Sequence, residues 1–295
     1  MITKSYEDNN ILEYYDNEGN IYKKYKNKIC DREINEIYYK NGDIYIGELK
    51  GDLYDKNLHG KGRYFYENGD IYTGIFYNKK KNGKGILKYN NKDIYEGNFL
   101  NDKKYGNGKF IHNTGDYYRG EFVNDNMEGL GEFFYHNNDH YKGDFKNDKK
   151  EGFGEYFFNN NDHYIGHFKN DRLNGYGKMI LNNHNLIKEF EGEFKNDYID
   201  GWVYIKFKDE SILETNYINE MLGGRALIYY DNKKYIFSGN MNYGIRIGSW
   251  YLYYGKDCLI KANYDELGEE INYQIFFDNI NKNNLNVTYL MNLIK

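Results

Sequence analysis

A motif of tyrosine, glycine and phenylalanine recurs through the middle of this chain at a fixed interval of 23 residues. In one copy, Tyr141, Gly143 and Phe145 alternate with polar residues, and Gly152 and Gly154 follow. A short fixed period constrains the fold strongly, because each repeat must form the same small unit and bury its apolar side chains against its neighbours. The sequence therefore predicts a stack of similar units and not one large core.

Each copy is predicted to be a β-hairpin, because its Tyr, Gly and Phe share one parity and fall on one face of a strand. Strands of about five to seven residues are expected, since turn residues recur at that density. In the copy that begins at Tyr141, we expect a first loop over residues 146–151 and a second turn over 159–162. The residues expected to form the repeated frame are Tyr72, Gly74, Phe76, Tyr95, Gly97, Phe99, Tyr118, Gly120, Phe122, Tyr141, Gly143, Phe145, Tyr164, Gly166 and Phe168.

Glycine has a packing role in this prediction. A single-layer sheet has no second layer to cover its apolar face, whereas one aromatic ring buries about 150–250 Å². Rings are therefore expected to lie over positions that lack a Cβ, including both glycines of the pair Gly152 and Gly154. Strands about 4.7–4.9 Å apart, in about ten or eleven units, predict a twisted rod or trough on the order of 100 Å long.

The repeat loses regularity towards both ends of the chain, as terminal repeats with one face in water require. We divide the sequence into a frayed N-terminus, a degenerate capping repeat, regular repeats, degenerate C-terminal repeats and a C-terminal helical cap, at residues 1–11, 12–44, 45–201, 202–275 and 276–295. The helix is predicted because Val287, Leu290, Met291 and Ile294 follow helical spacing. It would either cover the last strand edge or dock into a partner's groove.

Composition narrows the class of protein. The chain of 295 residues holds 36 Tyr and 18 Phe, and disordered segments are poor in aromatics. Its net charge of −5 disfavours nucleic acid as a partner. No apolar run approaches the length of a membrane span. Two widely separated cysteines, Cys30 and Cys258, suit a reducing compartment, so we expect a cytoplasmic protein.

The pattern Tyr-x-Gly-Glu/Asp-Phe, followed seven residues after the Phe by Gly-x-Gly, resembles the MORN (membrane occupation and recognition nexus) repeat. The match is good over residues 45–201 and loose over 12–44 and 202–275, where Lys24, Thr215 and Ala262 stand at glycine positions. The resemblance implies an all-β fold of elongated, single-layer antiparallel hairpins, often dimeric, used as a scaffold. It also implies cytoskeletal, cell-cortex or axonemal settings, such as radial spokes, and attributed phospholipid binding. The family has no catalytic residues of its own to carry over.

Specificity in a repeat scaffold is expected at positions that vary while the frame stays fixed. The residue between the paired glycines should point away from the tyrosine face, and it changes from Lys61 and Lys84 through Asn107 to apolar residues. An apolar stripe on an outer face usually marks an interaction surface. The alternative is that it packs inside the protein, against the C-terminal segment or in a tightly wound trough. The candidate partner-binding residues are Leu130, Phe134, Phe153, Phe157, Tyr176, Ile180, Trp202 and Tyr204.

Lysines recur in two successive copies of one loop and are expected to share an edge of the sheet. They suit anionic lipid head groups, at about 1 kcal/mol per lysine. The alternative is a solvated edge that prevents sheet-to-sheet aggregation, since Asp125 and Glu128 follow nearby. The candidate lipid-binding residues are Lys79, Lys80, Lys81, Lys84, Lys103 and Lys104.

No catalytic, cofactor or metal site is predicted. His140, His163 and His167 recur near one another, but no cysteine or carboxylate set completes a ligand shell. No nucleophile, base and orienting acid can be assembled from the pattern. The sequence favours a non-enzymatic scaffold that binds a cytoskeletal or axonemal protein at the cytoskeleton, cell cortex or cilium, with a homodimer as a further expectation. A peripheral membrane adaptor that binds anionic phospholipids is the alternative.

Overall fold

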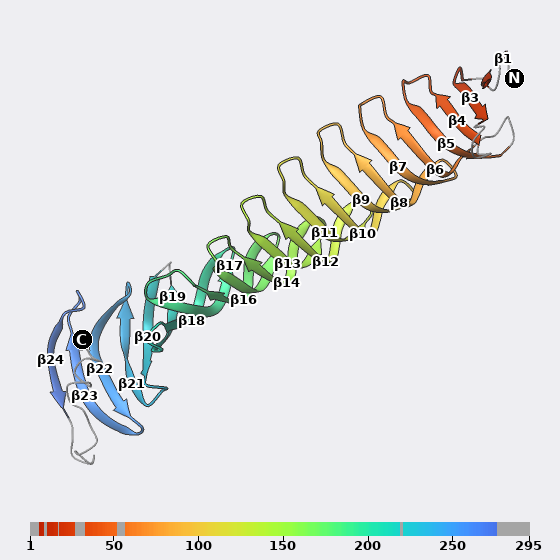
Figure 1. Ribbon diagram of the computed structural model, residues 1–295. Coiled ribbons are helices and arrows are strands. Elements are labelled where there is room, and N and C mark those ends of the chain that lie inside the picture. The colour runs from red at the N-terminus through yellow and green to blue at the C-terminus, as the bar shows by residue number, and fades with distance from the viewer. Residues whose placement is uncertain are drawn as a thin grey trace. The chain divides into compact units, whose positions relative to one another are not determined.

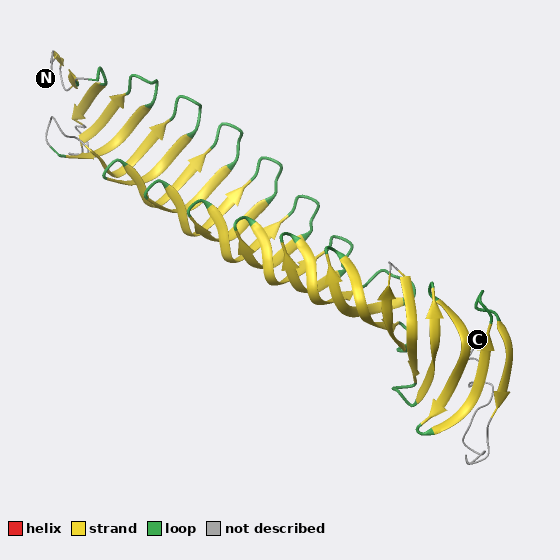
Figure 2. Ribbon diagram, turned by 180° about the vertical axis from the view of Figure 1, so that it is seen from behind, coloured by secondary structure: helices red, strands yellow, loops and turns green. Residues whose placement is uncertain are grey.

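The computed structural model describes residues 6–8, 11–16, 18–26, 33–51, 57–218 and 221–275. All of the regular secondary structure among these described residues is β-strand (Figure 1, Figure 2). The chain divides into two units, residues 1–149 and 150–295, and each is described by itself. The predicted C-terminal helix over 276–295 lies outside the described residues.

In the first unit, strands that are consecutive in the sequence pair antiparallel, as a chain of hairpins requires. The strands are β1 (Tyr6–Asp8), β2 (Ile11–Tyr15), β3 (Ile21–Lys26), β4 (Glu33–Tyr38), β5 (Ile44–Lys50), β6 (Asn57–Phe65), β7 (Ile71–Tyr77), β8 (Lys80–Lys88), β9 (Ile94–Leu100), β10 (Lys103–Ile111), β11 (Tyr117–Val123), β12 (Asn126–Phe134) and β13 (His140–Lys146). Residues 6–8 and 11 thus lie in strands, within the segment expected to be frayed.

The second unit has the same consecutive antiparallel pairing. Its strands are β14 (Lys149–Phe157), which begins at the end of the first unit, β15 (His163–Lys169), β16 (Arg172–Ile180), β17 (Ile187–Lys195), β18 (Tyr198–Phe207), β19 (Ile212–Ile218), β20 (Met221–Tyr230), β21 (Tyr235–Asn242), β22 (Ile245–Tyr254), β23 (Asp257–Tyr264) and β24 (Glu270–Ile275). The all-β class and the hairpin repeat are therefore confirmed.

The first turn of each regular hairpin is tighter than expected. Between β9 and β10 only Asn101 and Asp102 remain, with φ of 50° and 73°. Two left-handed residues form a type I′ turn, which matches the twist of paired strands. The predicted loop over 146–151 is wrong for this reason, because β13 ends at Lys146 and β14 begins at Lys149. The returning strands are correspondingly longer, at nine residues in β8, β10, β12, β14 and β16.

The turn aspartates also join neighbouring hairpins, which the sequence pattern did not indicate. Asp102 Oδ1 accepts a hydrogen bond of 2.8 Å from the backbone N–H of Lys81, and Asp125 Oδ1 accepts one of 2.8 Å from Lys104. At the opposite edge, Asp116 Oδ1 accepts one of 2.7 Å from the N–H of His136, which holds the pKa of the Asp116 carboxyl below its ordinary value. Each hairpin is thereby fixed to the next at both ends of its strands.

The predicted seating of rings over glycine is confirmed at the frame positions. Tyr95 is fully buried, and its hydroxyl donates a 2.9 Å hydrogen bond to the Asn98 carbonyl. A Cβ on Gly97 would lie 2.4 Å from the Tyr95 hydroxyl, and one on Gly108 would lie 2.6 Å from it. Phe99 and Phe122 pack edge-on against the same ring, each with centroids 5.1 Å away. The ring needs both glycines, because any side chain there would occupy its place.

The first glycine of each Gly-x-Gly pair has a different role. The prediction that an aromatic ring lies over this glycine as well is wrong. Gly106 has φ of +62°, and a Cβ there would meet only the Asn98 amide at 3.8 Å. The register between β9 and β10 shifts at this point, which marks a β-bulge. A left-handed residue in a bulge favours glycine, and the bulge bends the strand and increases its twist.

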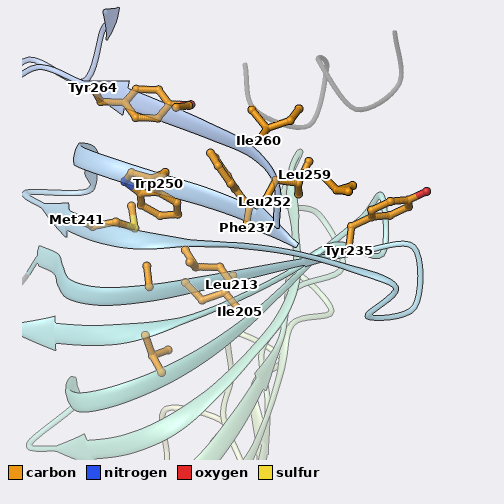
Figure 3. Packing of buried hydrophobic residues seen from close by; sticks show 13 residues of the cluster. Ile205, Leu213, Tyr235, Phe237, Met241, Trp250, Leu252, Leu259, Ile260 and Tyr264 are labelled. Carbon is orange, nitrogen blue, oxygen red and sulfur yellow. The ribbon is translucent and has the colours of Figure 1, made fainter. Parts of the chain in front are cut away.

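In the degenerate C-terminal repeats the tyrosine and glycine of the frame are replaced by other residues, and apolar side chains such as Phe237, Trp250 and Leu252 form a buried cluster (Figure 3). Trp250 is fully buried over Gly239 and donates a 3.0 Å hydrogen bond to the Asn240 carbonyl. Thr215 stands at a glycine position and is fully buried, with its hydroxyl 3.2 Å from the Arg225 carbonyl. The ring position two residues before Thr215 is leucine, which leaves room for a side chain. The buried cluster comprises Val203, Ile205, Leu213, Ala226, Tyr235, Phe237, Met241, Trp250, Leu252, Leu259, Ile260, Ala262 and Tyr264.

Candidate functional site

The face opposite the buried tyrosines, here called the outer face, carries the residues that differ between repeats. In the first unit it has an open groove with a volume of about 710 Å³ across β7 to β11. Gly85, Gly97 and Gly108 also line it, with their backbone, because a Cβ on each would point to the tyrosine face on the other side of the sheet. The walls are Thr73, Lys84, Ile86, Glu96, Asn98, Asn107, Lys109 and Arg119. These groups provide no pairing of a nucleophile with a histidine base.

Several polar groups of this groove are held by neighbours in the same sheet. Arg119 is hydrogen-bonded to the Glu132 carboxylate, and Lys109 Nζ lies 4.4 Å from the centre of the Tyr117 ring. Asn98 Nδ2 donates a 3.3 Å hydrogen bond to the Asn107 carbonyl. The groove therefore has fixed walls, and part of its positive charge is already engaged.

Four of the predicted partner-binding residues point outward as expected. Leu130 in the first unit and Phe153, Tyr176 and Trp202 in the second have exposed fractions of 66%, 51%, 53% and 44%. Each stands directly after the bulge glycine of its repeat, so the bulge sets where its side chain emerges. Their role in binding stays a prediction.

The other four predicted residues are only partly exposed, so the stripe is not uniform. The Phe134 ring is stacked between Tyr117 and His140, with centroid distances of 4.4 Å and 4.1 Å. Phe157 is stacked on His163 in the same way, at 4.2 Å. Ile180 and Tyr204 are also half-buried. Neighbouring strands place rings directly opposite Phe134 and Phe157, which sequence parity alone could not reveal.

Carboxylates surround the aromatic residues of the second unit, and sequence reasoning did not select them. Glu193 is paired across the strands with Tyr176, while Glu191 and Glu214 are both paired with Tyr204. Burial first, and then the nearby Glu191 carboxylate, raises the pKa of Tyr176. The acid-aromatic surface is defined as Tyr176, Glu191, Glu193, Trp202, Tyr204 and Glu214. The available signal was the recurrence of Glu at alternate positions of β17, at Glu189, Glu191 and Glu193.

Cations close to this surface are paired with other acids. Lys178 Nζ lies 2.9 Å from Glu189. Lys195 Nζ lies 3.7 Å from Asp200, and Arg172 Nε lies 3.9 Å from Asp197. Within the described part of the second unit, no ion pair is formed by Glu191, Glu193 or Glu214. Lys178 nevertheless stands opposite Glu191 across the strands, and Arg225 acts electrostatically on Tyr229, the partner of Glu214. The surface therefore combines exposed rings with a net negative charge.

The six candidate lipid-binding lysines do not share one edge. Lys79, Lys80, Lys84 and Lys103 are exposed. Lys81 and Lys104 lie on the tyrosine face, because side chains alternate along a strand. These two ammonium groups cover aromatic rings, with Lys81 Nζ 5.5 Å from the centre of the Tyr66 ring and Lys104 Nζ 4.7 Å from that of Phe110. Burial lowers the pKa of both lysines.

The histidines have structural contacts. His167 Nδ1 lies 3.1 Å from the Tyr176 carbonyl, and its ring meets Phe153 edge-on at 5.6 Å. His163 Nε2 lies 3.3 Å from a Glu155 carboxylate oxygen. Among the described residues, no group of three or more His, Cys, Asp or Glu side chains is placed to hold a metal ion. No described helix has the length and apolar character needed to cross a bilayer.

In a comparison with known protein families, the MORN repeat matches this chain at residues 45–71, 72–94, 95–117, 118–140, 141–163, 164–186 and 190–201. The chain belongs to the MORN-repeat family. The matches cover the regular hairpins, so the repeated Tyr, Gly and Phe positions of this MORN-repeat protein lie within the family pattern. No curated protein matches it.

Solved structures similar to this MORN-repeat protein include the TCP10 domain of Danio rerio CPAP, with 10% identity, a TM-score of 0.35 and coverage of 90% of this chain and 99% of that domain. A point mutant of that domain has 12% identity, a TM-score of 0.36 and the same coverage. The TCP domain of SAS-4 (dCPAP) from Drosophila melanogaster, solved with a proline-rich motif of Ana2, has 16% identity and a TM-score of 0.28, and covers 67% of this chain and 90% of that one. Likenesses this weak support no inference about a partner.

Proposed function

We propose that this MORN-repeat protein is a non-enzymatic scaffold that holds a protein partner on the outer face of its second unit. The observation that carries the proposal is the outward exposure of Phe153, Tyr176 and Trp202 on successive repeats. Aromatic residues are enriched in protein interfaces and dominate binding energies there. Because each ring emerges beside a bulge in a fixed sheet, the surface is ordered before a partner binds, which reduces the entropy cost of association.

The cellular setting is proposed from the family. Because MORN-repeat proteins occur in such settings, we propose that this protein is a cytoplasmic scaffold at a cytoskeletal, cell-cortex or axonemal structure, such as a radial spoke. The absence of catalytic activity is likewise proposed from the non-catalytic character of the repeat.

The experiment is affinity purification with the whole chain, comparing the wild type with the double variant Phe153→Asp plus Tyr176→Asp. We expect at least a tenfold loss of specifically bound proteins, because two carboxylates replace two contact rings. The matched control is Leu100→Asp plus Tyr105→Asp, two residues of the first unit with similar exposure of 42% and 47%. Recovery of the same proteins at unchanged levels with the Phe153 and Tyr176 variant would remove this surface from the proposal.

A second candidate function is a peripheral membrane adaptor, and the exposure of Lys79, Lys80, Lys84 and Lys103 favours it. Four lysines at about 1 kcal/mol each can attract an anionic bilayer. Flotation with vesicles that contain phosphatidylserine and a phosphoinositide tests it, with these four lysines changed to glutamate. Loss of flotation in the variant supports the adaptor, whereas no flotation of the wild type removes it.

A further inference from the structure

The acid-aromatic surface has a chemistry more specific than an apolar patch. Its exposed rings alternate with carboxylates across neighbouring strands, about 4.8 Å from one strand to the next. Tyr176 on β16 stands opposite Glu193 on β17. Across the bulge between β17 and β18, Glu193 faces the segment that contains Trp202. A carboxylate therefore lies between two aromatic side chains.

A second set of the same kind lies one step along the strands. Tyr204 on β18 is paired with Glu191 on one side and with Glu214 on the other. The Tyr229 hydroxyl donates a 3.1 Å hydrogen bond to Glu214. This bond orients the Glu214 carboxylate while it leaves acceptor capacity, since an ionised carboxylate has about four lone-pair sites. The surface thus presents a fixed pattern of rings and negative charges.

We propose that this surface binds an arginine-bearing extended segment of a partner protein. The proposal rests on the proposed scaffold function and names the chemistry of its partner. A guanidinium group is planar, stacks on aromatic faces and forms paired hydrogen bonds to a carboxylate. Both interactions are available at one place here, because Glu193 is flanked by the rings of Tyr176 and Trp202.

Charge complementarity favours this occupant over the other candidates. Lys178 stands opposite Glu191 across the strands and is paired with Glu189, so the set Glu191, Glu193 and Glu214 keeps a net negative charge for a partner. An anionic lipid surface would be repelled by these three carboxylates. A lysine would supply charge but not the planar fork, so arginine is preferred over lysine. The other occupants become outcomes of the test.

The test begins with a display library of random dodecapeptides panned against the whole chain. We expect enrichment of arginine over lysine, and loss of the enriched peptides when Tyr176→Ala and Trp202→Ala are combined. The control is Tyr105→Ala, an aromatic residue of the first unit with 47% exposure. Peptides that need Tyr176 and Trp202 but carry no excess of arginine would overturn the arginine proposal and leave the scaffold function standing. Absence of any enriched peptide would overturn the arginine proposal. Peptides that bind the double variant as well as the wild type would also overturn it, and they would count against this surface as the scaffold's binding site.

A charge exchange then identifies the carboxylate. Binding of the most enriched peptide is followed by fluorescence anisotropy, with its key arginine replaced by lysine, citrulline or glutamate. We expect citrulline to weaken binding about tenfold or more and lysine to weaken it less. Glu193→Lys should weaken the arginine peptide and restore binding of the glutamate peptide, whereas Glu121→Lys in the first unit should do neither. Glu193 is exposed, so the variant is expected to fold. Unchanged binding in Glu193→Lys would overturn the assignment.

A second copy of this chain is a competing occupant, because its exposed lysines could meet the carboxylates. Sedimentation velocity of the wild type and of Glu193→Lys distinguishes it. Self-association abolished by Glu193→Lys would overturn the proposal in favour of a homodimer contact. Equal sedimentation of the two proteins supports a separate partner.

Discussion

At the scale of single residues, the two glycines of each Gly-x-Gly pair meet different physical requirements. Gly108 leaves room for the buried Tyr95 ring, whereas Gly106 supplies a left-handed backbone in open space. The same residue type is therefore needed once for its missing Cβ and once for its φ. Substitutions that separate these two properties should have different costs.

We predict that Gly97→Ala lowers the free energy of unfolding by about 2 kcal/mol, the usual cost of overpacking. Its Cβ would meet the Tyr95 hydroxyl at 2.4 Å and the Gly108 Cα at 2.8 Å. Gly106→Ala should cost about 1 kcal/mol, the price of a left-handed alanine, and Gly106→Asn less, because asparagine tolerates this conformation. Urea unfolding followed by circular dichroism measures all three. Glu96→Ala is the surface control, and a loss equal to that of Gly97→Ala would contradict the ring-seating account.

At the scale of the hairpin, the two-residue turn does more than reverse the chain. Asp125 has φ of +79°, and its carboxylate holds the backbone N–H of Lys104 in the preceding hairpin. The turn thus fixes a hairpin internally and joins it to its neighbour. Asparagine and aspartate suit both tasks, because they tolerate the left-handed region and carry an acceptor oxygen.

We predict a graded series at Asp125. Asp125→Asn should change stability little, because it keeps both the acceptor and the tolerance of positive φ. Asp125→Gly should cost about 1 kcal/mol for the lost hydrogen bond. Asp125→Ala should cost about 2 kcal/mol, because left-handed strain adds about 1 kcal/mol. Thermal unfolding of the three variants provides the ranking. If glycine proved as damaging as alanine, backbone strain at this turn would be negligible.

At the scale of the whole molecule, stability rests on contacts between neighbouring strands, and repeat proteins of this kind couple mainly through nearest neighbours. Both tryptophans, Trp202 and Trp250, lie in the second unit. Trp250 is fully buried and so reports the folding of the C-terminal cluster. Damage to one part of the array should therefore have a limited effect on the other.

We predict that Gly97→Ala shifts the urea midpoint measured by circular dichroism more than the midpoint measured by tryptophan fluorescence. The physical reason is that the strained ring lies in the first unit, whereas the fluorescent reporters lie in the second. The wild type, measured by both probes, is the reference. Equal shifts by both probes would show that the two units unfold as one cooperative body.

Tyrosine burial along the molecule also predicts sensitivity to alkali. Burial raises the pKa of Tyr66 and Tyr89 to about 12, and it also raises that of Tyr72 and Tyr95. The unfolded chain loses these protons near pH 10 while the folded state keeps them. The unfolded state then binds fewer protons, so stability is retained below about pH 10 and falls as pH rises towards 12. Phenolate absorbance and circular dichroism should change together. Ionisation of all tyrosines near pH 10 with the β signal intact would contradict this.

The repeat sequence by itself determined the hairpin period, the antiparallel pairing and the ring-over-glycine frame, because these depend on parity and spacing within one strand. It also placed Leu130, Phe153, Tyr176 and Trp202 on the outer face. Only the tertiary structure decided what stands opposite each residue across the strands. That register turned Lys81 and Lys104 onto rings, stacked Phe134 between two neighbours, and set Glu193 beside Tyr176. Cross-strand partners lie many residues apart in sequence, and bulges shift their alignment, so periodicity alone could not reveal them.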